Sequence, residues 1–336
     1  HDMSLSNLTF PGALYLDGEE CYAPGVLGFN GTRNLQTYIE QDSINLFKDN
    51  IRLKGALRLN EQGLFASGKF YSNYIEFEAN NLQIFSGKML GFVNHLKSGS
   101  YFQNNTFVID KAILNYSPYD SAFLIKSGDG LFQIYNKFNF SGDLYYDGEN
   151  LNGSGQFDSK TINMTSSHYF FDNQDIVSAD VDFELINSDQ LIQLRVQGSS
   201  VEYHVSDKSV FVSKSNHTFN LPEIKYSLDF DYFLLNLNEN KILFQNNIFS
   251  DYGDCNTYRY GKKGFSYKAL NAEYDLNSGE LCLDGGIQLD LKKFWIQPKN
   301  NGFCVLANGD FPIFRGATLI KKRKIFKDKL INNQNV

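Results

Sequence analysis

Residues 53–70 read LKGALRLNEQGLFASGKF, and residues 140–157 read FSGDLYYDGENLNGSGQF. The two stretches align without a gap at an offset of 87 residues. The matched positions are Gly55 with Gly142, Leu57 with Leu144, Leu64 with Leu151, Ser67-Gly68 with Ser154-Gly155, Phe70 with Phe157, Ile75 with Ile162, Phe77 with Met164 and Leu82 with Tyr169. Similarity at a fixed period indicates an architecture that repeats one structural unit along the chain.

Strand signals continue on both sides of this repeat. Ile75 and Phe77 alternate with Glu76 and Glu78, a period of two residues that is typical of half-buried β-strands. Gly, Asn and Asp interrupt the runs at 60–63, 129–130, 147–148, 152–153, 277–279, 284–286, 300–302 and 308–309. The chain also contains 30 Phe and 20 Tyr, which suit pleated surfaces, but only 6 Pro.

These patterns predict an all-β fold, an elongated repetitive β-structure with few helices. A unit this small cannot bury both faces of its strands alone, so we expect units to stack. The stack would be either a β-solenoid or an open β-taco or jellyroll. A helix is expected only in minor places, such as Asn34–Phe47 or about the last fifteen residues.

The repeat also predicts a division of the chain into successive segments. The predicted segments are a strand-rich N-terminal part (1–50), a first β repeat unit (51–137), a second β repeat unit (138–250), a C-terminal β module (251–320) and a basic tail (321–336). A third related unit is expected at Phe265–Leu289, where alternating residues surround the turn Asn277-Ser278-Gly279.

The charge of the chain argues against a nucleic-acid partner. The formal net charge is −7, and the only basic run, Lys321–Lys324, is typical of a solvated end. No stretch approaches the ~20 apolar residues of a membrane helix, so no transmembrane segment is expected. No signal peptide is expected in the opening residues His1–Asn7, which are typical of a piece cut from something longer or of an artificial junction.

The four cysteines, Cys21, Cys255, Cys282 and Cys304, are widely spaced and form no CxxC pair, which argues against a compact zinc site. Buried free thiols are the favoured interpretation. The alternative is one disulfide, with Cys282–Cys304 as the first pair to consider.

The sequence offers no constellation that predicts catalysis, cofactor binding or metal binding. Asp180/Asp182 and Asp229/Asp231 are spaced to share a strand face, and solvated faces explain them. His95, His168, His204 and His217 lack metal-ligand spacing, which favours structural or surface roles. Ser127–Gly130 lacks the Lys-Ser/Thr ending of a phosphate loop and is predicted to be a plain turn between strands.

Two kinds of glycosylation motif occur. Asn-x-Ser/Thr sequons at Asn7, Asn30, Asn139, Asn152 and Asn216 are expected by chance in an Asn-rich chain. Asp42-Ser43-Ile44 and Asp120-Ser121-Ala122 match the phrase that Bacteroidota O-glycosylate on exported proteins, and chance accounts for these at least as well.

The repeated stretches carry a resemblance to a known group of proteins. "LRLNEQGLFASGKF" and "LYYDGENLNGSGQF" resemble a recurring module of very large uncharacterised cell-envelope proteins of Bacteroidota. In that group an aromatic segment and an Ala-Asp dipeptide follow the unit, as do "HYFFDNQDIVSADVDFEL" and Ala179-Asp180 here. The stretches 115–136 and 267–306 are also similar to neighbouring parts of these proteins. The group has no assigned activity, so the resemblance implies no catalytic residue.

A looser similarity links "ALNAEYDLNSGELCLDGGIQL" (269–289) to the periplasmic β-jellyroll family of lipopolysaccharide transport. That resemblance implies an open β-stack whose apolar groove holds acyl chains.

These observations favour a non-catalytic structural or scaffolding segment of a large exported envelope protein, located in the periplasm, at the outer membrane or on the cell surface. Its expected partners are neighbouring segments of a larger chain or other envelope proteins. One alternative is a lipid- or glycan-binding groove lined by the surplus Phe and Tyr. Another is a β-helix enzyme acting on polysaccharides, which would need acids and bases clustered in a cleft.

Overall fold

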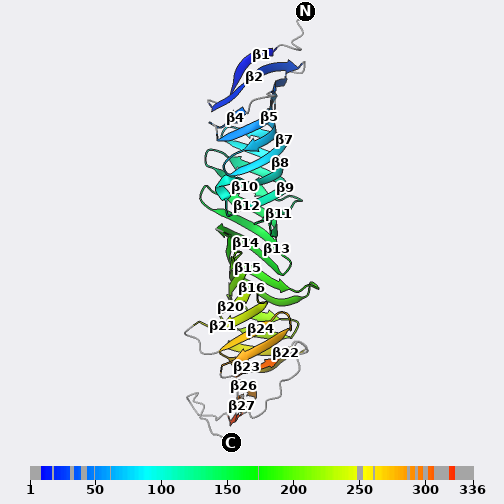
Figure 1. Ribbon diagram of the computed structural model, residues 1–336, viewed down its shortest axis with the longest axis vertical. Coiled ribbons are helices and arrows are strands. Elements are labelled where there is room, and N and C mark those ends of the chain that lie inside the picture. The colour runs from blue at the N-terminus through cyan, green and yellow to red at the C-terminus, as the bar shows by residue number, and fades with distance from the viewer. Residues whose placement is uncertain are drawn as a thin grey trace, which may run out of the picture. The chain divides into compact units, whose positions relative to one another are not determined.

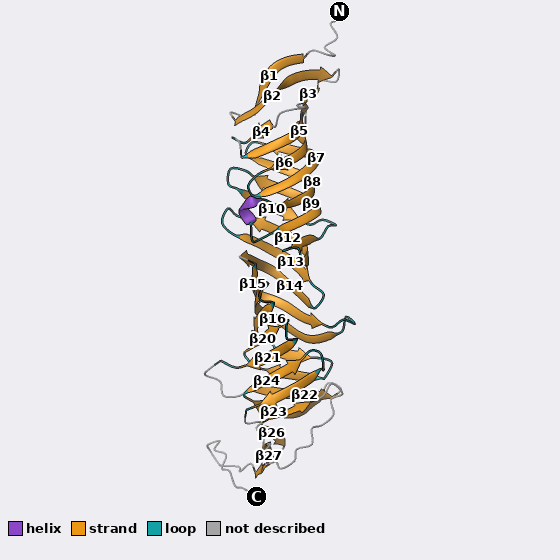
Figure 2. Cartoon of the chain, viewed as in Figure 1, coloured by secondary structure: helices purple, strands orange, loops and turns teal. Residues whose placement is uncertain are grey.

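The fold is known from a computed structural model, which describes residues 9–16, 19–30, 34–38, 44–48, 50–60, 62–172, 174–247, 253–259, 262–285, 288–291, 294–297, 302–305 and 318–321. Strands dominate these residues, and one 3-10 turn occurs at Ser100–Phe102 (Figure 2). The all-β prediction is therefore confirmed. The minor helix considered over 34–47 is wrong, because β3 (Asn34–Tyr38) and β4 (Ile44–Leu46) are strands there. The other possible helix, in the last residues, lies outside the described part.

Contacts divide the chain into two compact units. Unit 1 consists of His1–Ser159 and His168–Gln174, and unit 2 of Lys160–Ser167 and Asp175–Val336. The remaining strands of unit 1 are β1 (Thr9–Leu16), β2 (Glu19–Asn30), β5 (Ile51–Asn60), β6 (Gly63–Tyr71), β7 (Ile75–Phe85), β8 (Lys88–Ser98), β9 (Phe107–Ser117), β10 (Ala122–Lys126), β11 (Phe132–Ile134), β12 (Phe138–Tyr146) and β13 (Leu151–Asp158). Residues of β14 (Ile162–Asp172) belong to both units.

Unit 2 continues with shorter strands. They are β15 (Asp175–Ile186), β16 (Ile192–His204), β17 (Ser209–Ser213), β18 (Phe219–Leu221), β19 (Tyr226–Asp229), β20 (Tyr232–Asn236), β21 (Lys241–Gln245), β22 (Gly253–Arg259), β23 (Lys262–Ala269), β24 (Asn271–Asp275), β25 (Glu280–Asp284), β26 (Gln288–Leu291), β27 (Phe294–Gln297), β28 (Gly302–Val305) and β29 (Thr318–Lys321).

The sequence repeat is also a repeat of strands. The offset of 87 residues places β7 on β14, β10 on β17 and β11 on β18 with identical bounds. It places β5, β6, β8 and β9 on β12, β13, β15 and β16 within two residues at each end. The structural repeat is therefore longer than the matched sequence, which ended near Leu82 and Tyr169.

The third predicted unit, Phe265–Leu289, contains a hairpin at its centre, and its relation to the other two units stays a prediction. β24 and β25 pair from Asn271↔Asp284 to Asp275↔Glu280, with the expected turn between them.

The long strands of unit 1 bulge near their middle. In β7 the buried residues are Ile75, Phe77 and Ala79 and then Leu82 and Ile84, so the alternation shifts by one residue at the exposed Asn80-Asn81. The pairing of β6 with β7 shifts register at the same place, between Ala66 and Gly68. Such a bulge bends a strand while keeping its apolar side chains on one face.

This bending folds the sheet of unit 1 over on itself. Strands β7, β8 and β9 lie side by side, and Tyr116 near the end of β9 lies in line with Met89 and Ile84 (Figure 1). Ser72 follows β6 and lies beside the start of β7, whereas Ile84 lies near the end of β7. The Tyr116 hydroxyl nevertheless lies 3.3 Å from Ser72 Oγ. Opposite ends of the sheet therefore meet, and the inward face of the bent strands encloses the core.

Unit 2 divides into two sheets at β16. The half of β16 at Ser200–His204 pairs with β17, whereas Arg195 in its other half pairs with β18. One sheet continues β17–β20–β21–β24–β25–β28, and the other continues β18–β19–β22–β23–β26–β27–β29. The chain thus places successive hairpins in alternate sheets. All these pairs are antiparallel.

Aromatic rings fill the interior of each unit. In unit 1, Phe70 and Phe77 stack with their centroids 4.6 Å apart. In unit 2, Phe233 on β20 lies 5.1 Å from Phe219 on β18, and these strands belong to different sheets. Phe183 and Phe244 flank Phe233 at 5.7 and 5.6 Å. Most of the described Phe residues and several Tyr residues therefore belong to the core, whereas Phe92 and Tyr101 are exposed.

Candidate functional site

Hollows of the described surface occur where turns and strand ends from different parts of one unit meet. One of them, the Arg52 pocket, lies in unit 1 and has a volume of about 470 Å³. A second in unit 1, the Asn105 pocket, and one in unit 2, the Gln193 pocket, each measure about 420 Å³. These volumes fall within the ~300–1,000 Å³ of small-molecule sites.

The Arg52 pocket is built by β5, the end of β6 and the turn between β9 and β10. Arg52, Lys54, Tyr71, Asn73 and Tyr74 line it, together with Ser121 of the β9–β10 turn. Asn50 donates a hydrogen bond from Nδ2 to the Pro118 carbonyl oxygen at 3.1 Å, which ties the two walls together.

The other two pockets have the opposite charge. The Asn105 pocket contains Glu149 and Asp172, and the Gln193 pocket contains Glu223; neither contains Lys or Arg. In the Asn105 pocket, Asn105 Nδ2 donates a hydrogen bond to the Phe171 carbonyl oxygen at 3.4 Å, which links two of the lining residues. Gln193 Nε2 likewise donates to the Leu276 carbonyl oxygen at 3.1 Å. Sequence reasoning identified none of these pockets.

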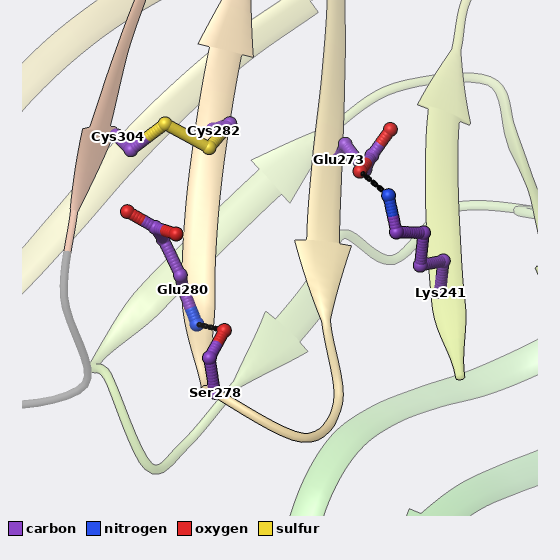
Figure 3. The surroundings of a disulfide bond; sticks show 6 residues. All are labelled: Lys241, Glu273, Ser278, Glu280, Cys282 and Cys304. Carbon is purple, nitrogen blue, oxygen red and sulfur yellow. Dashed lines mark hydrogen bonds and ion pairs between the residues drawn. A yellow bond between two sulfur atoms is a disulfide. The ribbon is translucent and has the colours of Figure 1, made fainter. Parts of the chain in front are cut away.

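Cys282 and Cys304 form a disulfide between β25 and β28 (Figure 3). They are directly opposite residues of the ladder, with Cα atoms 3.9 Å apart. The favoured interpretation of buried free thiols is therefore wrong for this pair, and the alternative pairing is correct. Cys255 is a buried free thiol as expected, and burial raises its pKa. The side chain of Cys21 lies outside the described residues.

Glu280 lies beside this disulfide and was missed by sequence reasoning. Its carboxylate and the two sulfur atoms all lie within 4.8 Å of one another, since Glu280 and Cys282 share a face of β25 (Figure 3). The Glu-x-Cys spacing was the available signal. Both sulfur atoms are committed to the disulfide, so the group does not provide thiolate ligands in this state. The next strands on this face carry the Lys241–Glu273 ion pair at 2.6 Å.

The four paired aspartates lie at exposed or half-buried positions of unit 2. Asp180 and Asp182 are exposed on β15, as expected, and Asp182 accepts a hydrogen bond from the Gly198 backbone N–H at 3.1 Å. Asp229 forms an ion pair with Lys214. Asp231 was expected to share its strand face, but β19 ends at Asp229 and Asp231 lies beyond it. Its carboxylate instead accepts from the Asn247 backbone N–H at 2.8 Å.

Three of the described histidines, His95, His168 and His204, each have a polar partner that is not another histidine. His95 lies 3.1 Å from Asp110, His204 lies 3.1 Å from Asp175, and His168 lies 3.1 Å from the Tyr145 hydroxyl. His217 is exposed. Each of the three contacts joins one histidine to one polar side chain, and the structural or surface roles of these histidines stay a prediction.

The remaining motifs lie in turns or on strands. Ser127–Gly130 is a turn between β10 and β11, closed by the Gly130 N–H donating to the Ser127 carbonyl oxygen at 2.8 Å. Asn139 and Asn216 are exposed, whereas Asn152 is buried. Ser121 is half-buried beside the Arg52 pocket, so O-glycosylation there stays a prediction. The side chains of Asn7, Asn30, Asp42 and Ser43 lie outside the described residues.

No protein-family model, curated protein or solved structure matches this chain. Among the described residues, none of the helices is long and apolar enough to cross a membrane. A functional interpretation therefore rests on the geometry of the chain itself.

Proposed function

We propose that the chain is a non-catalytic structural segment of a large exported cell-envelope protein, in the periplasm, at the outer membrane or on the cell surface. One observation supports the proposal most: the strands β5–β11 recur as β12–β18 at an offset of 87 residues. In repeat proteins, each further copy of a group of strands packs on the copy before it and makes the protein longer. Neighbouring segments or other envelope proteins would be its partners.

The interior supports a structural role over an acyl-chain groove. Such a groove needs an apolar hollow, whereas the inward positions of the described strands hold aromatic and aliphatic side chains in contact with one another. The three described hollows are lined largely by polar side chains. A polysaccharide-cleaving role would require several acids and bases clustered in one cleft, whereas His95 with Asp110 and His204 with Asp175 are two-residue pairs of solvent-exposed side chains.

A register-matched deletion tests the proposal. Removing residues 51–137 joins Asn50 to Phe138, so β12 takes the place of β5 beside β3 and β4. We expect this variant to fold with a cooperative thermal transition and a strand-rich circular dichroism spectrum. The matched control removes 51–141, which also takes away the buried Phe138 and Phe140 and the first half of β12, and it should prevent cooperative folding.

Small-angle X-ray scattering provides the shape. We expect the full chain to be elongated and the 51–137 deletion to be shorter with a similar cross-section. A full chain that scatters as a compact sphere would contradict a structural role based on repeated length. Failure of the 51–137 deletion to fold, under conditions in which the full chain folds, would contradict it as well.

A further inference from the structure

The Arg52 pocket differs from the other hollows in its charge. The chain has a net charge of −7, yet this pocket contains Arg52 and Lys54 and no acidic residue. The Asn105 and Gln193 pockets contain acids and no Lys or Arg. An anion is therefore attracted to one described hollow and repelled from the other two.

The two cations are available because the nearby acids are already paired. Glu76 forms an ion pair with Lys97 at 2.8 Å, and Glu78 forms one with Lys69 at 2.8 Å. The hydrogen bond between Lys69 and Glu78 lowers the pKa of Glu78 and raises that of Lys69. Within the described residues, no carboxylate lies at ion-pair distance from Arg52 or Lys54. A guanidinium in this position can form the two-pronged pair with a carboxylate that Arg geometry favours.

Tyrosine rings lie next to the two cations. Tyr71 is the cross-strand partner of Arg52, and the Lys54 ammonium lies 5.6 Å from the centroid of the Tyr71 ring. Tyr71 and Tyr74 are half-buried, so each ring presents part of its surface to the pocket. Sugar rings bind to aromatic faces through their C–H bonds, whereas a bare inorganic anion gains nothing from them.

The wall that carries these rings is fixed by local hydrogen bonds. Ser72 Oγ accepts from the backbone N–H groups of Tyr74 and Ile75 at 3.2 and 3.0 Å. The Tyr74 carbonyl oxygen accepts from the Gly99 N–H at 2.6 Å. A preformed wall reduces the entropy lost when a ligand binds.

We propose that the Arg52 pocket binds an acidic saccharide, a sugar that carries a carboxylate. The carboxylate pairs with Arg52, Lys54 adds a second positive charge, and the sugar ring lies against Tyr71 and Tyr74. The exposed amide of Asn73 supplies hydrogen bonds to hydroxyl groups. This site is independent of the proposed structural role, since it depends on surface side chains of one part of unit 1.

Titration calorimetry on the full chain at low ionic strength tests the site. The probes are trigalacturonic acid, sialyllactose and a hyaluronan tetrasaccharide, with galactotriose as the neutral match of the first and inorganic phosphate as the bare anion. We expect at least one acidic probe to bind, the neutral match to bind at least about tenfold more weakly, and added salt to weaken binding. Phosphate should not compete at equal concentration.

Variants locate the binding. Arg52→Gln should weaken binding about tenfold or more, as for loss of a charge-assisted pair. Tyr71→Leu should weaken it and Tyr71→Phe should preserve it, because the ring remains. Lys137→Gln, an exposed lysine outside the pocket, should leave binding unchanged. Thermal unfolding of each variant verifies that it is folded.

Three results would overturn the proposal: no acidic probe binds, phosphate competes as well as the sugar, or Arg52→Gln binds like the unaltered chain. None of them bears on the deletion experiment above, so the two proposals fail separately.

Discussion

Gly55 and Gly68 face each other across the β5–β6 ladder so closely that neither can carry a side chain. A Cβ atom on Gly55 would lie 2.8 Å from Gly68 Cα, and one on Gly68 would lie 2.7 Å from Gly55 Cα. Gly142 and Gly155 repeat this pairing, with 2.8 Å in both directions. The matched glycines of the sequence repeat therefore mark the place where two strands approach each other at the bulge.

We predict that Gly68→Ala destabilises the chain by about 2–4 kcal/mol. The new methyl group meets backbone atoms, and Gly68 has a φ of +137°, which L-residues rarely adopt. Gly155→Ala should cost a similar amount, since it occupies the equivalent position. Urea unfolding followed by circular dichroism measures both.

Gly128→Ala is the matched control for this prediction. Gly128 has a φ of +53°, but no atom lies within 4 Å of the place that a Cβ atom would take, so only the backbone cost of about 1 kcal/mol remains. Equal losses for Gly68→Ala and Gly128→Ala would mean that close approach of the strands is not the reason why glycine recurs at this place in the repeat.

The strand class and the repeat could be predicted because both depend on local patterns. Period-two alternation and Gly- or Asn-containing turns act within a few residues, and the repeat needs only a comparison of the chain with itself. The bulge in β7 could not be predicted in this way. Asn80-Asn81 interrupts the alternation in the sequence, but the shift in register appears only when β7 pairs with β6. Nor does any local pattern show that hairpins after β16 alternate between two sheets.

The Arg52 pocket was unpredictable for a related reason. Arg52 and Lys54 occupy ordinary outward positions of a strand, and the same pattern would suit a solvated face. Their significance depends on Glu76 and Glu78 being paired elsewhere and on Tyr71 lying across the ladder. From the sequence, the disulfide could be predicted only as one pairing among several, because the spacing of cysteines does not reveal which strands become neighbours.

A second prediction concerns a buried hydroxyl. Among the described residues, the Tyr274 hydroxyl is buried and accepts or donates no hydrogen bond. An unsatisfied buried polar group costs about 1–3 kcal/mol, so Tyr274→Phe should leave stability unchanged or raise it by up to about 1 kcal/mol. Tyr116→Phe is the control, since it removes the hydrogen bond to Ser72 and should lower stability by about 0.5–1.5 kcal/mol. A clear loss from Tyr274→Phe would show that its hydroxyl has a partner.

A third prediction concerns alkaline pH. Burial raises the pKa of Tyr274 to about 12, above its ordinary value of 10.0. The folded state therefore holds this proton more tightly than the unfolded state does, so the stabilisation is complete below pH 10 and is lost as the pH rises through 12. Tyr203 and Tyr267 act in the same direction, with pKa values raised by burial to about 12.

Urea unfolding at several pH values checks this sign. Stability should fall between about pH 10 and pH 12, with each such tyrosine contributing at most about 1.4 kcal/mol per pH unit. Tyr274→Phe should flatten the slope by up to that amount. Tyr116→Phe should also flatten it, since burial raises the pKa of Tyr116 against the opposing effect of the hydrogen bond to Ser72. An unchanged slope in Tyr274→Phe would mean that its hydroxyl ionises equally easily in the folded and unfolded chain.

The disulfide between Cys282 and Cys304 gives the last prediction. It closes a loop with a sequence separation of 22, and loops of this length stabilise a fold by about 2–4 kcal/mol. The double substitution Cys282→Ser and Cys304→Ser should therefore lower the urea midpoint, and a reductant should lower that of the unaltered chain but not that of the variant. Cys255 provides the internal control: it is buried and its thiol pKa is raised, so it should react with thiol reagents only on unfolding. If reductant shifts both proteins equally, the effect arises elsewhere and this pair contributes little to stability.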